Sequence, residues 1–290
     1  MQLAIATFAI NGAPFKETDS SLIAPLKQSG IEAEFVVWDD AAADWSGYDA
    51  VLVRSIWNYH EKPTQFIKWL ELLESASVPM LNPTAMLRWN MNKRYLRELA
   101  AHGVPILPTY WPLENESTSL VAILQKYGWQ DAVIKPIISA SGTDTWSTSV
   151  SGAAADQERF DALHQRKALM IQQFAPQIIT GEYSLVFFGG RYSHTILKKP
   201  GKNALFVQEE HGGSSTLLST VPDAFIEQAA NILHVACNII GTIPIYARVD
   251  VIEDAGTLIL MELELIEPEL YLLTDEISQR FANAIAADLT

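Results

Sequence analysis

Three acidic residues and one arginine in the last part of the chain are spaced so that they could bind a metal ion. They lie in the stretch YARVDVIEDAGTLILMELELIEP, where two runs of alternating character flank the turn signal DAGT. This pattern predicts a β-hairpin. If its turn is centred on Gly256, Asp250 faces Glu262 and Arg248 faces Glu264 across the two strands.

The two faces of this hairpin would differ in character. Side chains two apart in a strand point the same way, so the four charged residues share one face. The other face would hold Val249, Val251, Ile259, Met261 and Leu263. Carboxylates placed opposite one another repel, and a single arginine cannot compensate three of them. Mg²⁺ prefers hard oxygen ligands, so the charged face suits a metal-nucleotide site. The alternative is a solvated strand face with a surface ion pair at Arg248.

Two lysines occupy positions where a cation is expected to meet an anion. Lys93 falls in the first turn of a helix predicted from Met91 to His102, where the helix dipole disfavours a cation unless an anion approaches it. Lys135 lies near the end of an apolar strand predicted from Asp131 to Pro136, and burying its ammonium without an anion is costly. Both lysines are candidates for binding phosphate. The alternative for Lys93 is a lysine solvated on a helix face.

Three loops or strand ends carry groups that could contact a ligand. The loop from Ser139 to Thr143 has small residues, which let backbone N–H groups approach an anion, although it lacks the lysine and the spacing of a P-loop. The segment from Gln172 to Phe174 could be a hinge whose amide groups read the edge of an adenine, or an ordinary strand end. In the polar loop from Glu209 to Gly213, His211 could be a general base or a substrate contact, or a solvated histidine.

A charged and aromatic cluster follows a predicted strand in the N-terminal region. The strand runs straight into the sequence RSIWNYH, and ligands of parallel sheets bind beyond the carboxyl ends of the strands. Arg54 could hold a substrate carboxylate through its forked guanidinium, with Ser55 beside it and with Trp57 and Tyr59 as walls of the pocket. The alternative is that the aromatic residues pack beneath the following helix and that Arg54 makes an interdomain ion pair.

The elements that must position these residues fall into two parts. Up to about Arg88 strands alternate with helices, which indicates a small parallel sheet. The elements expected there are strands at 3–10, 34–38 and 50–54 and helices at 20–29 and 63–75. From about Val104 the chain turns to an α+β pattern, with long helices predicted from Pro222 to Ile240 and from Glu276 to Leu289.

Composition excludes several classes of protein. The chain of 290 residues is 49% hydrophobic and 19% charged, which is typical of a globular protein of about two domains or three small ones. A net charge of −14 without a basic stripe speaks against a nucleic-acid partner. The lone Cys237 cannot form an intramolecular disulfide, and neither a signal peptide nor an apolar stretch long enough to span a bilayer is visible. We therefore expect a cytoplasmic protein.

Taken together, these motifs resemble the ATP-grasp superfamily of carboxylate-activating ligases. The correspondence runs in order through Lys93, VIKP, the small-residue loop, MIQQF, Gly181-Glu182, RVD and MELE. The motifs VRSIWNYH, LVFFGG, VQEEHGG and LMELELIEP are most similar to the branch that contains O-ureido-serine cyclo-ligase of cycloserine biosynthesis. D-alanine:D-alanine ligase and glutathione synthetase are similar more distantly. The resemblance implies α/β and α+β architecture, with an N-terminal parallel α/β domain at 1–88 and two α+β subdomains, central at 89–168 and C-terminal at 169–290, that enclose ATP.

The resemblance also implies roles for individual residues. ATP would be bound by Lys93, Lys135, Ser141, Gly142, Gln172, Gln173, Phe174 and Glu182, the last at the ribose hydroxyls. Mg²⁺ or Mn²⁺ would be held by Asp250, Glu262 and Glu264, while Arg248 and Lys198 steady the transferring phosphoryl group. The acceptor substrates would face Arg54, Ser55, Trp57, Tyr59, His211, Gly212 and Gly213.

The implied reaction is ATP-dependent formation of a C–N bond. A small-molecule carboxylate would become an acyl phosphate, and a nitrogen nucleophile on a second substrate or in the same molecule would attack it, mainly through positioning and electrostatics. The expected partners are small carboxylates and amines, with neither nucleic acid nor a membrane, and a homodimer is left open. Two alternatives remain, a small-molecule kinase that leaves phosphate on its product and a non-catalytic ATP-binding module.

Overall fold

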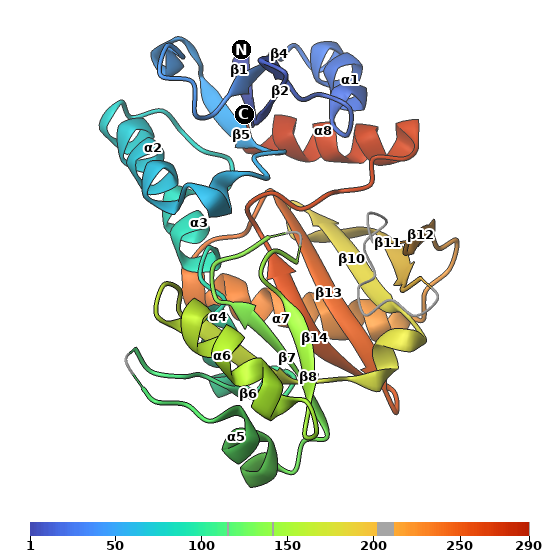
Figure 1. The fold of residues 1–290 in the computed structure, drawn as a ribbon. Coiled ribbons are helices and arrows are strands. Elements are labelled where there is room, and N and C mark those ends of the chain that lie inside the picture. Colours follow the sequence, from blue (N-terminus) through green and yellow to red (C-terminus); the bar gives the residue numbers. More distant parts are fainter. Residues whose placement is uncertain (115, 141, 202–211, 290) are drawn as a thin grey trace.

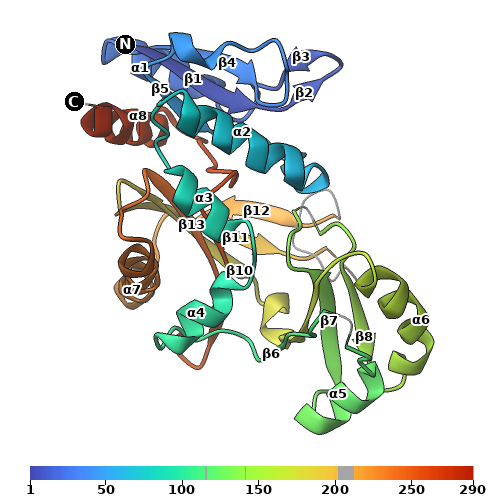
Figure 2. The same ribbon diagram turned by 90° about the vertical axis from the view of Figure 1, so that its left-hand side faces the viewer.

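The computed structural model describes residues 1–114, 116–140, 142–201 and 212–289. Its described strands form three larger sheets and one two-stranded ribbon. The N-terminal sheet lies at one end of the molecule, and the two antiparallel sheets lie together at the other end (Figures 1 and 2). This arrangement brings the predicted ATP-binding and metal-binding residues of the two antiparallel sheets to one cavity between these sheets.

The N-terminal sheet is parallel, as predicted. Its strand order is β4-β1-β5, with β1 (Gln2–Thr7) between β4 (Glu32–Val37) and β5 (Ala50–Val53). Shorter elements accompany it: β2 (Ala9–Ile10), β3 (Ala13–Pro14), η1 (Ser20–Leu22), η2 (Trp45–Gly47), η3 (Tyr59–Glu61), α1 (Ile23–Gln28) and α2 (Pro63–Ser75). Alternate residues of β1 belong to different hydrophobic clusters, with Leu3 and Ile5 in one and Ala4 and Ala6 in the other. Both faces of the central strand β1 are therefore covered, which is why β1 is apolar and buried from Leu3 to Ala6.

The last helix, α8 (Asp275–Leu289), returns to the N-terminal end of the molecule (Figure 1). Phe281 and Ile285 pack in one cluster with Leu3 and Ile5 of β1, and the ring of Phe281 stacks on Phe188 of β10 (Glu182–Phe188) at 4.5 Å between centroids. The helix therefore joins the N-terminal sheet to the C-terminal sheet. The predicted range 169–290 contains the five strands of the C-terminal sheet. It also includes β9 (Leu169–Gln173), which pairs in the central sheet, and α8, which packs against the N-terminal sheet.

The central sheet has the strand order β6-β9-β7-β8 and is antiparallel throughout. Its strands are β6 (Thr109–Tyr110), β7 (Asp131–Pro136), β8 (Trp146–Ser149) and β9 (Leu169–Gln173). The helices α5 (Leu120–Tyr127) and α6 (Ala153–His164) pack on one face around Ile134 and Phe160. Since side chains alternate along a strand, Val133 and Lys135 of β7 lie on the opposite face, where they line a cavity.

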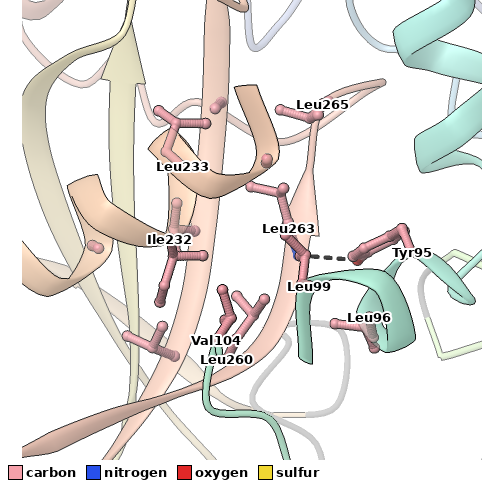
Figure 3. Packing of buried hydrophobic residues seen from close by; sticks show 14 of the residues in the cluster. Tyr95, Leu96, Leu99, Val104, Ile232, Leu233, Leu260, Leu263 and Leu265 are labelled. Carbon is pink, nitrogen blue, oxygen red and sulfur yellow. Dashed lines mark hydrogen bonds between the residues drawn. The ribbon is translucent and has the colours of Figure 1, made fainter. Parts of the chain in front are cut away.

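The C-terminal sheet has five strands in the order β12-β11-β10-β13-β14. Beside β10, its strands are β11 (Arg191–Lys199), β12 (Ser214–Leu217), β13 (Tyr246–Asp254) and β14 (Thr257–Glu264), and η4 (Pro176–Ile179) precedes β10. The helices α4 (Tyr95–Ala101) and α7 (Asp223–Ile240) cover one face through Leu96, Leu99, Ile232 and Leu233, as Figure 3 shows. The other face is left for the charged residues of β10, β11, β13 and β14.

The hairpin of β13 and β14 has the predicted register at its charged end. Arg248 pairs with Glu264, and Asp250 pairs with Glu262. The turn differs from the prediction, because two residues, Ala255 and Gly256, form it with φ of 49° and 85°. Two-residue hairpin turns favour such positive φ values.

A β-bulge explains why the charged register is nevertheless as predicted. The register shifts between Asp250 and Val251, so that Met261 is an extra residue on β14. The bulge also turns side chains over: Ile259 and Met261 pack near Ile252, outside the core that holds Val249 and Leu263. The prediction that Ile259 and Met261 share a face with Val249 was wrong for this reason.

The helix predicted from Met91 to His102 is interrupted. The helix α3 (Thr84–Asn90) ends before Met91, and α4 begins at Tyr95. Lys93 therefore lies in the turn between two helices, where its backbone N–H donates to Ile137 O at 2.8 Å. The argument from a helix dipole does not apply to Lys93, since this backbone contact fixes its position. None of the helices in the described ranges is long and apolar enough to cross a membrane.

Candidate active site

A cavity of about 440 Å³ lies between the central sheet and the C-terminal sheet, and aromatic residues of the N-terminal part close it. Its volume lies in the usual range for small-molecule sites. Most of the residues predicted to bind ATP and metal line it. These are Lys93, Lys135, Gly142, Gln172, Gln173, Phe174, Glu182, Asp250, Glu262 and Glu264, together with Lys198, Arg248, Trp57 and Tyr59.

Asp250 is the centre of a buried charge network on the C-terminal sheet. Arg248 donates to its carboxylate through Nε and Nη2 at 2.9 Å, and Lys198 Nζ lies 3.1 Å from it. Ser184 Oγ donates at 2.5 Å, and Lys198 also pairs with Glu182 at 2.6 Å. Burial alone would raise the pKa of Asp250, but Arg248 and Lys198 bring it well below its ordinary value. Asp250 is therefore ionised in the unliganded protein.

Glu264 shares the guanidinium of Arg248 with Asp250. Burial raises the pKa of Glu264 to about 7, because the nearby carboxylates of Asp250 and Glu262 oppose the effect of Arg248. Besides burial, the negative charges of Asp250 and Glu262 contribute to this rise. A divalent cation would favour the ionised form of Glu264.

Glu262 connects the hairpin of β13 and β14 to Lys93, one of the two lysines predicted to bind phosphate. Lys93 Nζ lies 2.6 Å from Glu262 Oε1 and donates to Ser139 O at 3.0 Å. The contact depends on β14, whose outer edge is held by side chains of the α3 and α4 region. Leu263 N–H donates to Tyr95 Oη at 3.0 Å (Figure 3), and Asn90 Nδ2 donates to Leu263 O at 2.7 Å. These bonds satisfy backbone groups that an edge strand would otherwise expose.

Lys135 is a cation without an ion-pair partner in the described part of the chain. Its alkyl stem leaves β7 on the cavity side. Burial lowers its pKa, and Lys93 lowers it further, although Glu262 and Glu182 act in the opposite direction. An anion bound in the cavity would remove the cost of holding this charge.

The predicted adenine hinge lines the cavity, but its backbone is partly engaged already. Gln173 N–H donates to Pro108 O at 2.8 Å, and Phe174 N–H donates to Asp131 O at 3.0 Å. These two amides therefore cannot read an adenine edge in this arrangement. The next residue, Ala175, also lines the cavity, as does Met261 from the β-bulge. The pairing of β9 with β6 and β7 decides which backbone N–H and C=O groups of the hinge remain free, and sequence periodicity does not predict this pairing.

The cluster after β5 divides into two pairs of residues. Trp57 and Tyr59 line the cavity, as predicted for pocket walls. Arg54 does not line it: its side chain is 1% exposed, and its Nε pairs with Asp19 at 2.8 Å. Ser55 Oγ donates to the same carboxylate at 3.0 Å. Because Asp19 occupies the position expected for a substrate carboxylate, the structure places Arg54 and Ser55 in the framework beneath the cavity.

Replacement of Arg54 by methionine is expected to lower the free energy of unfolding by about 3–5 kcal/mol, because it leaves the buried Asp19 charge without a partner. Urea unfolding measures the effect. The matched control, Arg88→Met, removes a pair whose side chains are 30% and 44% exposed and should cost about 1 kcal/mol or less. A loss below about 1 kcal/mol for Arg54→Met, accompanied by a raised KM for the carboxylate substrate, would restore the substrate-binding interpretation.

The remaining predicted residues lie in loops. Gly142 lines the cavity with a φ of +67°, a conformation that suits glycine. Gly212 and Gly213 precede β12 and do not line the cavity, whereas Ser215 of β12 does. Ser141 and His211 lie outside the described residues.

The site also contains residues that sequence reasoning missed. Glu267 and Tyr271 line the cavity just beyond β14, and Tyr271 has a positive φ of 48°. The signal for Glu267 was present in the sequence, since an isolated glutamate in LIEP continues the acidic run of MELE. Glu267 lies in an irregular segment after β14, so the alternation of side chains along a strand does not predict where it points.

The fit of a metal ion rests on the character of the donors and not on a preformed cage. Within the ranges that the structure describes, no three His, Cys, Asp or Glu side chains already converge as metal ligands. Instead, the three predicted carboxylates are held by cations: Asp250 by Arg248 and Lys198, Glu262 by Lys93 and Glu264 by Arg248. They are hard oxygen donors that line one cavity, and the carboxylates of Asp250 and Glu262 lie close enough to Glu264 to contribute to the rise in its pKa. These residues therefore fit a divalent cation.

Sequence comparisons relate the whole chain to a protein of cycloserine biosynthesis. The family model "D-cycloserine synthetase DcsG, N-terminal domain" matches residues 3–82. The cycloserine biosynthesis protein DcsG of Streptomyces lavendulae is 30% identical over 305 aligned residues, which cover 99% of this chain and 98% of DcsG. The similarity thus extends through the cavity and the hairpin.

Structural comparisons show the fold. The crystal structure of D-cycloserine synthetase DcsG has a TM-score of 0.88 and 27% identity, with all of both chains covered. D-alanine–D-alanine ligase of Bacillus anthracis complexed with ATP has a TM-score of 0.70 and 15% identity, covering 100% of this chain and 97% of the ligase. A RimK domain ATP-grasp protein of Sphaerobacter thermophilus has a TM-score of 0.70 and 17% identity, with 98% of both chains covered. The predicted ATP-grasp fold is confirmed.

Proposed function

The chain belongs to the family of the cycloserine biosynthesis protein DcsG, an ATP-grasp ligase family, and we propose that its cavity binds MgATP beside a small amino acid. The protein is an ATP-dependent ligase that forms C–N bonds. The substrate we propose is an O-ureido-serine-like amino acid of D configuration, because the relative is named for D-cycloserine and the motifs resemble the O-ureido-serine branch. Activation of its carboxylate and attack by a nitrogen of the same molecule would close a five-membered ring.

The lysines are proposed to bind the phosphates of ATP. Lys93 and Lys135 both line the cavity, and Lys135 lacks an ion-pair partner among the described residues. The adenine would lie toward Gln172, Gln173, Phe174 and Ala175, with Glu182 at the ribose and Gly142 over the phosphates. Compact cations bind phosphate as point charges, so neither lysine needs a fixed geometry before the ligand arrives.

Asp250, Glu262 and Glu264 are proposed to hold Mg²⁺ or Mn²⁺. When bound, the metal would offset the negative charge that keeps a carboxylate away from the terminal phosphate of ATP. In the unliganded protein Lys93 pairs with Glu262 and Lys198 pairs with Asp250, so cations already lie beside two of these carboxylates.

Arg248 and Lys198 are proposed to stabilise the phosphoryl group during transfer. Both side chains are less than a tenth exposed and are fixed by Asp250, so their charges are oriented before the reaction begins. The substrate carboxylate oxygen attacks the terminal phosphorus and ADP leaves. The nitrogen then attacks the acyl carbon, the C–O bond to phosphate breaks, and phosphate leaves with that oxygen.

The observation that carries the proposal is the meeting, in one cavity, of Lys135, which has no ion-pair partner among the described residues, with the carboxylates of Asp250, Glu262 and Glu264. The test is a screen of O-ureido-D-serine, other ureido acids, amino acids and small peptides for substrate-dependent release of ADP. We expect ADP and free phosphate in equal amounts. A stable phosphorylated product without release of phosphate would favour a kinase. An ATP affinity that does not depend on Mg²⁺ would favour a non-catalytic module.

The raised pKa of Glu264 predicts a pH-dependent affinity for Mg²⁺. The metal binds the ionised carboxylate, whereas the unliganded protein holds a proton there up to about pH 7. Binding then releases this proton, so the apparent Kd for Mg²⁺ in the ATP complex should rise as pH falls below about 7 and level off above it. By the same linkage, this group makes the unliganded protein less stable as pH rises from about 4.5 to 7.

Magnesium titrations from pH 5.5 to 8.5 followed by calorimetry measure the effect. Protonation of ATP contributes to the same range, and Glu264→Gln separates the two, since this variant keeps only the dependence that belongs to the nucleotide. Identical pH profiles for the wild type and Glu264→Gln would contradict the prediction.

A further inference from the structure

We propose that Glu267 binds the ammonium group of the amino-acid substrate and thereby selects carboxylates that carry an α-amine. This inference rests on the proposed function and adds a substrate contact to it. Glu267 lies in the same cavity as the nucleotide and metal residues, in the segment that follows β14.

Glu267 differs from the neighbouring carboxylates because it forms no ion pair with any residue that the structure describes. Glu182, Asp250, Glu262 and Glu264 each form an ion pair with a lysine or arginine. No hydrogen bond or ion pair engages the carboxylate of Glu267 among the described residues. Burial raises its pKa well above the ordinary value, and the nearby Glu264 raises it further. A cationic group from a ligand would supply the missing partner.

The backbone that carries Glu267 is fixed by side chains from distant parts of the chain. Each carbonyl from Leu265 to Leu270 accepts a side-chain hydrogen bond, at distances between 2.7 and 3.1 Å. The donors, in order along the segment, are Asn82, Tyr246, Trp57, Arg54, Arg248 and His194. The Glu267 carbonyl itself is held by Trp57 Nε1 at 3.1 Å. Such support from outside the site keeps a binding group in place.

The surroundings of Glu267 suit an ammonium better than a phosphate or a metal. Trp57 and Tyr59 line the same cavity, and aromatic faces attract cations. Burial raises the pKa of Tyr59, and the negative charge of Glu267 raises it further. Phosphate is proposed to bind at the cations Lys93 and Lys135, whereas the carboxylate of Glu267 would repel it. An amine beside the reacting carboxylate would therefore find one carboxylate and two aromatic walls.

Affinities of two acids that differ only in the α-amine test the proposal. Calorimetry on the full-length protein loaded with Mg²⁺ and the non-hydrolysable analogue AMP-PNP compares O-ureido-D-serine with 3-(ureidooxy)propanoic acid. We expect the amino acid to bind about 10- to 100-fold more tightly, as a charge-assisted hydrogen bond implies. In Glu267→Gln the two acids should bind within about threefold of each other, because only the amino acid loses affinity.

The controls separate recognition of the amine from other effects. Glu71→Gln, on the exposed side of α2, should keep the wild-type ratio. Glu267→Gln removes no side-chain hydrogen bond or ion pair to the described residues, so its melting temperature should not fall. Equal affinities in the wild type, binding of neither acid, or a shifted Mg²⁺ midpoint in Glu267→Gln would overturn the assignment. If the wild-type protein did not bind Mg·AMP-PNP at all, this result would instead count against the proposed function.

Discussion

Replacement of Glu262 by glutamine is expected to lower kcat/KM for ATP by about 10²–10³-fold, the range found when one preorganised electrostatic group is removed from an active site. Glu262 lies on β14 opposite Asp250 and pairs with Lys93 at 2.6 Å. The amide keeps the shape of the side chain but removes the negative charge that both Lys93 and a divalent cation require. The concentration of Mg²⁺ at half-maximal activity should therefore rise as kcat/KM falls. Steady-state kinetics at several metal concentrations measure both effects.

The matched control for Glu262→Gln is Glu158→Gln, since Glu158 is exposed on α6 and lies outside the cavity. This variant should retain wild-type kinetics. Activity of Glu262→Gln within about threefold of the wild type, with an unchanged metal dependence, would show that Glu262 does not serve the metal or the phosphates. The ion pair to Lys93 would then be a structural contact between β14 and the turn before α4.

Replacement of Lys135 by methionine is expected to change stability and activity in opposite directions. The unliganded protein bears the cost of a buried ammonium without an ion-pair partner in the described residues, so the methionine variant should melt at a higher temperature. The same change removes a cation proposed to meet the phosphates, so kcat/KM for ATP should fall by about 10²-fold or more. Differential scanning calorimetry and steady-state kinetics on one preparation measure the pair of effects.

Lys68→Met is the control for Lys135→Met, because Lys68 is exposed on α2 and remote from the cavity. Neither its melting temperature nor its activity should change appreciably. A Lys135→Met variant that is less stable than the wild type, or one that keeps full activity, would contradict the assignment of Lys135 to the phosphates. The first result would mean that the ammonium already has a stabilising partner in the unliganded protein.

The sequence predicted those parts of the site that depend on strand alternation and on the cost of burying charge. The alternation around Asp250 and Glu262 defined one charged face, and the lysine in an apolar strand singled out Lys135, which lines the cavity. Both arguments are local, so a single chain was enough to make them. Local reasoning failed at Met261, because a β-bulge adds one residue without a turn signal and reverses the face of the residues beside it.

The sequence could not assign partners that come from distant segments. Arg54 has the chemistry of a carboxylate-binding residue, and its carboxylate is Asp19, supplied by the loop before η1. Glu267 was overlooked because its lack of an ion-pair partner is visible only when the charged residues around the cavity are placed together. The break between α3 and α4 was missed for a similar reason, since Lys93 is held by a backbone contact with Ile137 from another segment.

Transfer of oxygen from the substrate to phosphate tests the central claim most directly. The protein is supplied with ATP, Mg²⁺ and O-ureido-D-serine labelled with ¹⁸O in its carboxylate, or with the labelled acid that the screen identifies. If a carboxylate is activated as an acyl phosphate, each molecule of inorganic phosphate released should contain one labelled oxygen, as mass spectrometry will detect. Unlabelled phosphate, or label retained in a stable phosphorylated product, would contradict the account.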